Sequence, residues 1–240
     1  MKRTLERPIG GISIKPVSVA SQVASALREK ILAGDLRPGM PLHEISLAES
    51  ASVSRNTIRE AVQILVREGL VRHNVHRGAA VTELANHDVD DIYRVRRTLE
   101  VAGVYASVNV EPAEIVALEE SIESMGRAVD AKDWLQSVAS DILFHRQLVG
   151  FLGSDRLNGF FGALLSELRL VLVYADSTGF SGEHLVPQHS ELVQLLKAGR
   201  VADCAAALIR HLEESEQNIR RVLGAQSNKQ SSEVLASFSV

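Results

Sequence analysis

From residue 85 to residue 223, apolar side chains recur every three to four positions, and only short turns interrupt this period. The period is that of an amphipathic helix, whereas strands would need an alternation of two. Pro112 suits a helix start and Gly199 a helix end. This part of the chain is predicted to be an all-α bundle of six helices. The six stretches are 87–108, 112–130, 133–150, 155–175, 183–198 and 201–223.

The residues before this bundle follow a different pattern. Helices are predicted at 21–33 and 43–51, and a third begins after Ser54, which is a good N-cap. Two short strands, 70–72 and 79–82, then flank a polar turn. Three helices followed by a two-stranded wing form a winged helix-turn-helix. The predicted fold class is therefore mainly α, with this module preceding the helical bundle.

Composition and charge also divide the chain. With 45% hydrophobic and 23% charged residues among 240, it is typical of a soluble globular protein. Residues 1–84 hold 12 Lys or Arg against 8 Asp or Glu, whereas the rest holds 14 against 22. A basic part joined to an acidic part indicates two tasks. The predicted units are a flexible arm (1–17), the winged helix-turn-helix (18–84), the helical bundle (85–224) and a tail (225–240).

Cysteine content and hydropathy indicate the compartment. Cys204 is the only cysteine and cannot form an internal disulfide, which fits a reducing environment. No apolar run approaches the 18 residues that a membrane span needs. The basic N-terminus lacks the apolar core of a secretory signal. We therefore expect a cytoplasmic protein without a membrane partner.

The third helix of the N-terminal module carries the DNA-reading chemistry. Arg55 and Arg59 are four residues apart near the helix start, where a recognition helix meets base edges. The guanidinium fork can bind guanine or phosphate in a bidentate way. The alternative is that both arginines are ordinary solvated side chains. The predicted DNA-binding residues are Ser54, Arg55, Asn56, Thr57, Arg59, Arg77 and Gly78.

The segments ILAGDLRPGMPL, VSRNTIREAVQ and HRGAAV resemble the DNA-binding domain of GntR-type bacterial transcription regulators, over residues 20–82. The resemblance implies that Arg55, Arg59 and the wing at Arg77 and Gly78 contact double-stranded DNA. A homodimer would read an inverted-repeat operator, because twofold symmetry places two heads symmetrically. The chain departs from the family pattern at Ile45, Ser52 and Asn56-Thr57.

Four polar residues lie on the apolar stripes of three bundle helices. Asp141 and His145 share the stripe of Trp134, Val138 and Leu148, and His189 and His211 lie on two later stripes. A buried unpaired carboxylate is costly. One Asp and three His suit a divalent transition metal ion, Zn above all, with Ni or Mn as alternatives. The competing interpretation is a metal-free hydrogen-bond network. His184 is a competing ligand candidate, but it lies off the apolar stripe that contains His189.

The segments RVRRTLE, DILFHRQL, HSELVQLLKAGR and ALIRHLEES resemble the helical effector domain called FCD, and six helices suggest its VanR-like type. The resemblance implies that the same four residues hold the metal and that a small organic acid binds beside it. Arg96 matches an arginine that faces the effector cavity, and Arg169 is a second candidate. The alternative for Arg96 is an i,i+4 ion pair with Glu100, which is worth little at a surface.

These patterns predict a ligand-responsive, homodimeric transcriptional regulator, a repressor of genes for organic-acid or related carbon metabolism, and not an enzyme. One alternative is a metal sensor, in which the ion itself is the signal. Another is a metalloenzyme fused to a DNA-binding head. Against the enzyme, the sequence has no HExxH motif and no obvious general base beside the ligands.

Overall fold

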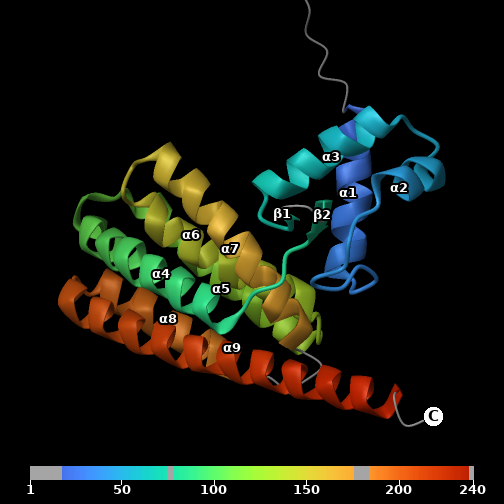
Figure 1. The fold of residues 1–240 in the computed structure, drawn as a ribbon. Helices are drawn as coiled ribbons and strands as arrows, with labels where there is room; N and C mark the ends of the chain where they lie inside the picture. The colour runs from blue at the N-terminus through green and yellow to red at the C-terminus, as the bar shows by residue number, and fades with distance from the viewer. Residues whose placement is uncertain (1–17, 75–77, 176–183, 238–240) are drawn as a thin grey trace, which may run out of the picture.

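The computed structural model describes residues 18–74, 78–175 and 184–237, arranged as a small head against a longer helical bundle (Figure 1). The predicted arm (1–17) and the wing residue Arg77 lie outside the described residues. The head is the winged helix-turn-helix expected from the sequence. Its elements are α1 (Val19–Leu32), α2 (Glu44–Ala51), α3 (Arg55–Arg67) and the antiparallel strands β1 (Val71–Asn74) and β2 (Gly78–Val81).

Local signals explain how α3 forms and where it begins. The Ser54 hydroxyl accepts the backbone N–H of Thr57 at 3.1 Å, which caps the helix as predicted. The apolar face of α3 is buried in the head core, while Arg55 and Arg59 remain exposed. Ser52, in the turn between α2 and α3, has a φ of +52°, a conformation that favours glycine.

The bundle follows the predicted helices closely until the last one. Its elements are α4 (Asn86–Ala106), the 3-10 turn η1 (Ser107–Asn109), α5 (Pro112–Asp130), α6 (Trp134–Gly150), α7 (Asp155–Ala175), α8 (Leu185–Lys197) and α9 (Val201–Ser237). The predicted end of the last helix near residue 223 is wrong, since α9 continues through Gly224 into the segment that was expected to be a tail. One glycine costs a helix only about 1 kcal/mol, and no proline follows it.

Helix α7 joins the two parts. Its Leu168 is buried in the bundle core, whereas Leu170, two residues later, is buried in the core of the head. Arg72 of β1 adds ion pairs to Glu167 of α7 and Asp88 of α4. In Figure 1 the wing strands accordingly lie next to α7. The described helices contain no segment with the length and apolarity that a bilayer crossing requires.

Candidate metal centre and effector cavity

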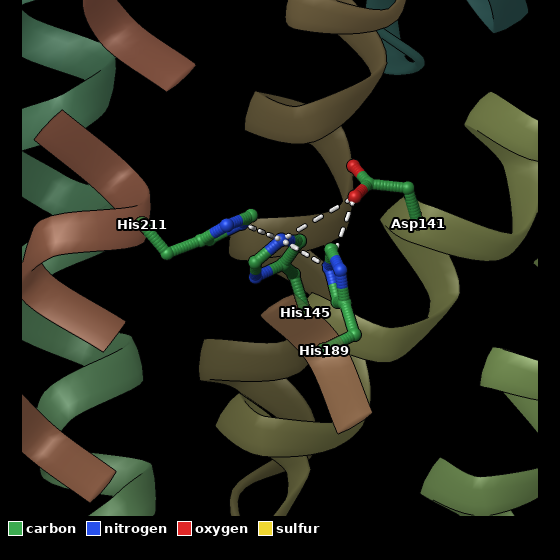
Figure 2. Close-up of side chains that lie close together, drawn as sticks. All are labelled: Asp141, His145, His189 and His211. Carbon is green, nitrogen blue, oxygen red and sulfur yellow. Dashed lines mark hydrogen bonds and ion pairs between the residues drawn. The ribbon is translucent and has the colours of Figure 1, made fainter. Parts of the chain in front are cut away.

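The structure brings the four predicted ligands together. Asp141 and His145 project from α6, His189 from α8 and His211 from α9, and their side chains converge on one point (Figure 2). One donor atom from each residue lies within 4.8 Å of the other three. The three imidazoles are buried, and the Asp141 side chain is 16% exposed. Residues 70 positions apart in the sequence thus form one cluster.

Each imidazole is oriented by a hydrogen bond from its outer nitrogen. His145 Nδ1 lies 2.6 Å from Glu100 Oε2, and His189 Nδ1 lies 2.7 Å from the carbonyl oxygen of Leu185. His211 Nδ1 lies 3.1 Å from Gln188 Oε1. These oxygens can only accept, so we assign the hydrogen of each ring to Nδ1. The second nitrogen, Nε2, then presents a bare lone pair when the ring is neutral.

The three Nε2 atoms face one another, which is unfavourable without a cation. His145 Nε2 lies 3.4 Å from His189 Nε2 and 3.3 Å from His211 Nε2. Neutral rings with Nδ1 protonated cannot hydrogen-bond through these atoms, because each is an acceptor. The Oδ1 atom of Asp141, 3.1 Å from His189 Nε2, adds a negative charge. The arrangement therefore favours a bound positive ion.

The spacing of the donors fits one transition metal ion. Nitrogen ligands of Zn lie 2.0–2.1 Å from the ion, so two neighbouring ligands of a tetrahedral site are about 3.3 Å apart. The observed nitrogen pairs at 3.3 and 3.4 Å match that separation, the distance from His145 Nε2 to Asp141 Oδ1 is 3.7 Å, and all donor pairs lie within 4.8 Å. Metal-binding histidines are also usually held in place by a hydrogen bond from the other ring nitrogen to a carboxylate or carbonyl oxygen.

Glu100 and Arg96 of α4 form the layer behind His145. Arg96 Nε donates to Glu100 Oε1 at 2.8 Å, and both side chains are almost completely buried, at 2% and 0% exposed. The i,i+4 ion pair between Arg96 and Glu100, which the sequence offered as the alternative role of Arg96, is present, but it is buried and not at the surface. Arg96 Nη2 is buried and has no hydrogen-bond partner among the described residues, and the guanidinium lies 4.9 Å from the Tyr93 ring centre.

The charged groups around His145 shift one another's pKa values. Burial alone would lower the pKa of His145, but the carboxylates of Glu100 and Asp141 outweigh it and raise that pKa. Burial would raise the pKa of Glu100, but His145 and Arg96 outweigh it and keep the carboxylate ionised. Burial lowers the pKa of His211 well below its ordinary value, with help from His189 and His145. A neutral His211 is the form that can bind a metal.

A cavity of about 300 Å³ opens beside the cluster, and Asp141 and His211 lie in its wall. An ion at the cluster would therefore be accessible to a small molecule. Helix α9 and Gln188 of α8 contribute the polar side of the cavity, and apolar residues of α6, α7 and α8 contribute the other side. The principal polar residues are Gln188, Glu214, Ser215, Asn218 and Arg221, and the apolar ones are Trp134, Val138, Leu172 and Leu185.

The two predicted effector arginines occupy different places. Arg96 is connected to His145 through Glu100, and its Nη2 atom is a buried donor with no partner among the described residues. Arg169 lies instead on the part of α7 that meets the head, where burial and the charge of Arg28 lower its pKa. Neither arginine is among the described residues that line the cavity.

The DNA-reading face has a feature that the sequence did not reveal. Arg59 Nε donates to Glu44 Oε2 of α2 at 2.8 Å, so one edge of its guanidinium is already engaged. Of the other predicted contacts, Ser54, Arg55, Asn56 and Gly78 are exposed on the head, and Thr57 is partly exposed.

Sequence reasoning missed the supporting and cavity residues. Glu100 was considered only as a partner for Arg96, although its contact with His145 bridges 45 positions. Glu214 and Asn218 follow His211 at spacings of three and seven, which places them along one side of α9. That spacing was a usable signal, but only tertiary packing shows that this side faces a cavity.

Family models match both parts of the chain. The model described as bacterial regulatory proteins of the gntR family matches residues 19–81, and the FCD domain model matches residues 91–214. This chain belongs to the GntR family. It is a DNA-binding transcriptional regulator of the FCD branch, as the sequence predicted, and its relatives are regulators rather than enzymes.

Individual relatives agree with this assignment. A probable D-xylose utilization operon transcriptional repressor of Paenarthrobacter nicotinovorans is 30% identical over 81% of this chain and 86% of its own length. The gluconate operon transcriptional repressor of Bacillus licheniformis is 34% identical over 55% of this chain and 54% of its own. A GntR-type regulator from Rhodococcus sp. RHA1 has a crystal structure with a TM-score of 0.73 and 31% identity, covering 86% of this chain and 98% of that one.

Proposed function

We propose that this regulator is a homodimeric repressor whose hold on an inverted-repeat operator is controlled by a small organic acid bound beside a divalent transition metal ion. The observation that carries the proposal is the convergence of three bare Nε2 atoms and Asp141 Oδ1 at the wall of a cavity. The donor set favours Zn, with Ni and Mn as alternatives. Two relatives that are named repressors of sugar-related operons support a role in carbon metabolism.

The proposed ligands are Asp141, His145, His189 and His211. When bound, the ion would supply a positive charge that attracts a carboxylate. Arg96 is the proposed second cation, because its Nη2 atom is buried with no hydrogen-bond partner among the described residues. A carboxylate that leaves water needs such charged donors in return.

Elemental analysis of the purified protein tests the metal site. One divalent ion per chain is expected, and His145→Ala and His211→Ala should each lose it and melt at a lower temperature, because binding energy to the native state disappears. His184→Ala is the matched control, since His184 is an exposed cavity residue outside the cluster. Full occupancy in the two cluster variants would remove these residues from the ligand set.

Measurements of operator affinity test whether a small organic acid controls DNA binding. A thermal-shift screen of small carboxylates on the metal-loaded protein should find stabilising acids, and such an acid should change operator affinity. Arg96→Ala should keep its metal and lose that change. If the metal alone changes operator affinity and no carboxylate does, the protein is a metal sensor instead.

A dimer has a candidate surface on α7. Leu157 and Phe160 lie one helical turn apart and are exposed, with Phe160 at 55%. Contiguous exposed apolar patches mark protein–protein contacts, and this pair is the proposed centre of one. The mass of the protein in solution should be that of a dimer, and Phe160→Glu should shift it toward the monomer. A monomeric wild type would exclude the proposed symmetric reading of DNA.

A further inference from the structure

The start of α2 lies against the exposed face of α3, which is the face predicted to read DNA. Glu44 is the first residue of α2, and its Oε2 atom accepts a hydrogen bond from Arg59 Nε at 2.8 Å. Arg59 belongs to the second turn of α3, and its side chain is 57% exposed. The first turn of α2 and the first two turns of α3 therefore form one continuous surface.

Ile45, the residue after Glu44, places an apolar side chain at this surface. It is 56% exposed, which is more than any other large apolar side chain among the described residues of the head. It belongs neither to the head core nor to the partly buried residues that pack against that core. A single exposed isoleucine needs no special explanation. This one, however, directly follows the residue that contacts a predicted reading arginine.

The chemistry of the α2 start limits what Ile45 can contact on a DNA duplex. Proteins bind the phosphate backbone mainly through cations and hydrogen-bond donors. The first turn of α2 contains no Lys or Arg, and the Glu44 carboxylate would repel a phosphate. A branched alkyl group cannot hydrogen-bond to a base edge either. In the major groove, the C5-methyl group of thymine is the apolar group that a base presents.

We propose that Ile45 is a specificity-determining residue that packs on the C5-methyl group of a thymine in each half-site of the operator. This inference rests on the proposed reading of the operator by α3. Glu44 lies next to Ile45 and is bonded to Arg59, so both side chains reach neighbouring parts of the groove. Base pairs are about 3.4 Å apart, so the thymine lies within about two base pairs of the base that Arg59 contacts.

A selection of duplexes from a random-sequence DNA pool by the full-length protein supplies the site for the test. The same selection with Arg59→Ala marks the base pair that Arg59 reads, because the preference there is lost. Each thymine of the wild-type site is then replaced by uracil in both half-sites, which removes only the C5-methyl group. One such replacement should weaken wild-type binding about 15-fold, which is about fourfold for each methyl group returned to water.

Variants of Ile45 connect this effect to one side chain. Ile45→Ala should bind the thymine site as weakly as the wild type binds the uracil site, and should not distinguish the two. Ile45→Val keeps a branched apolar group and should still prefer thymine. The salt dependence of Ile45→Ala should equal that of the wild type, because no phosphate contact is lost. Val116→Ala, at an exposed position of α5, is the control and should behave as the wild type.

The outcomes separate this inference from the proposed reading of DNA by α3. The inference is overturned if no replacement by uracil weakens binding, or if Ile45→Ala still distinguishes thymine from uracil as the wild type does. A sensitive thymine far from the Arg59 position would also overturn it. In these three cases an enriched sequence that depends on Arg59 still supports the reading of DNA by α3. If the selection enriches no sequence, both proposals fail.

Discussion

Glu100 contacts both a proposed metal ligand and the proposed effector arginine. Its two oxygens are divided between His145 Nδ1 and Arg96 Nε, at 2.6 and 2.8 Å. The carboxylate therefore fixes the orientation of the imidazole and partly neutralises the buried guanidinium. A substitution at Glu100 should therefore affect the binding of both the metal and the acid, although Glu100 is proposed to contact neither of them directly.

Glu100→Gln should weaken metal binding by about 10- to 100-fold, as is typical when a carboxylate behind a metal-bound histidine is removed. The amide keeps the shape of the side chain but loses the charge that supports His145. Competition with a chromophoric chelator measures the affinity. Glu120→Gln, at an exposed position of α5, is the control. Equal affinities in the two variants would mean that Glu100 serves Arg96 alone.

At the scale of single elements, α3 is predicted to read the operator. Arg55→Ala and Arg59→Ala should each cost about 1–3 kcal/mol of specific binding if the two arginines read bases. Arg94→Ala, on the bundle surface, should cost nothing. Binding by the wild type should also weaken steeply with salt, because phosphate contacts release counterions. Unchanged operator affinity in both α3 variants would contradict the role of α3.

Helices α4 and α9 are joined by Glu216, which accepts from Arg97 at 2.6 Å and Arg220 at 2.9 Å. Burial would raise the pKa of Glu216, but these hydrogen bonds outweigh it and lower that pKa. A lowered carboxyl pKa stabilises the fold above the ordinary value of about 4.3, and this contribution is lost as the pH falls through the folded-state pKa.

Glu216→Gln should therefore destabilise the protein by about 1 kcal/mol at neutral pH, a value discounted for the partial exposure of both arginines. The difference from wild type should shrink below about pH 4, where the wild-type carboxylate becomes protonated. Thermal unfolding of both proteins across this pH range measures it. A difference that is constant with pH would point to packing and not to charge.

At the scale of the whole molecule, α7 connects the cavity to the head. Leu172 lines the cavity, Leu170 is buried in the head core, and Glu167 pairs with Arg72 of the wing. A shift of α7 on acid binding would therefore be transmitted to the head through packed side chains. Coupling of this kind needs two arrangements that bind the acid differently.

Arg72→Ala should reduce the ratio of operator affinities measured with and without a stabilising acid from the thermal-shift screen, by about fivefold or more if this pair carries a typical coupling energy. Metal content and acid affinity should change little, since Arg72 is distant in sequence and structure from the cluster. Lys197→Ala, which removes an exposed ion pair with Glu119 between α8 and α5, is the control. An undiminished ratio would place the coupling elsewhere.

The sequence by itself determined the helices and the four converging side chains. Helical period, Ser54 as a cap and Pro112 as a start are local signals, and helix α5 begins and ends where they predict. Asp141, His145, His189 and His211 could be found because a polar residue on an apolar stripe must point into the bundle.

Only the tertiary structure decided which residues surround them. Glu100 meets His145 because α4 packs against α6, Arg169 turns toward the head, and Glu214 faces a cavity formed by four helices. A helix period fixes the direction of a side chain around its own axis. It does not fix the neighbouring helix or its vertical offset, which depend on how whole apolar faces fit together.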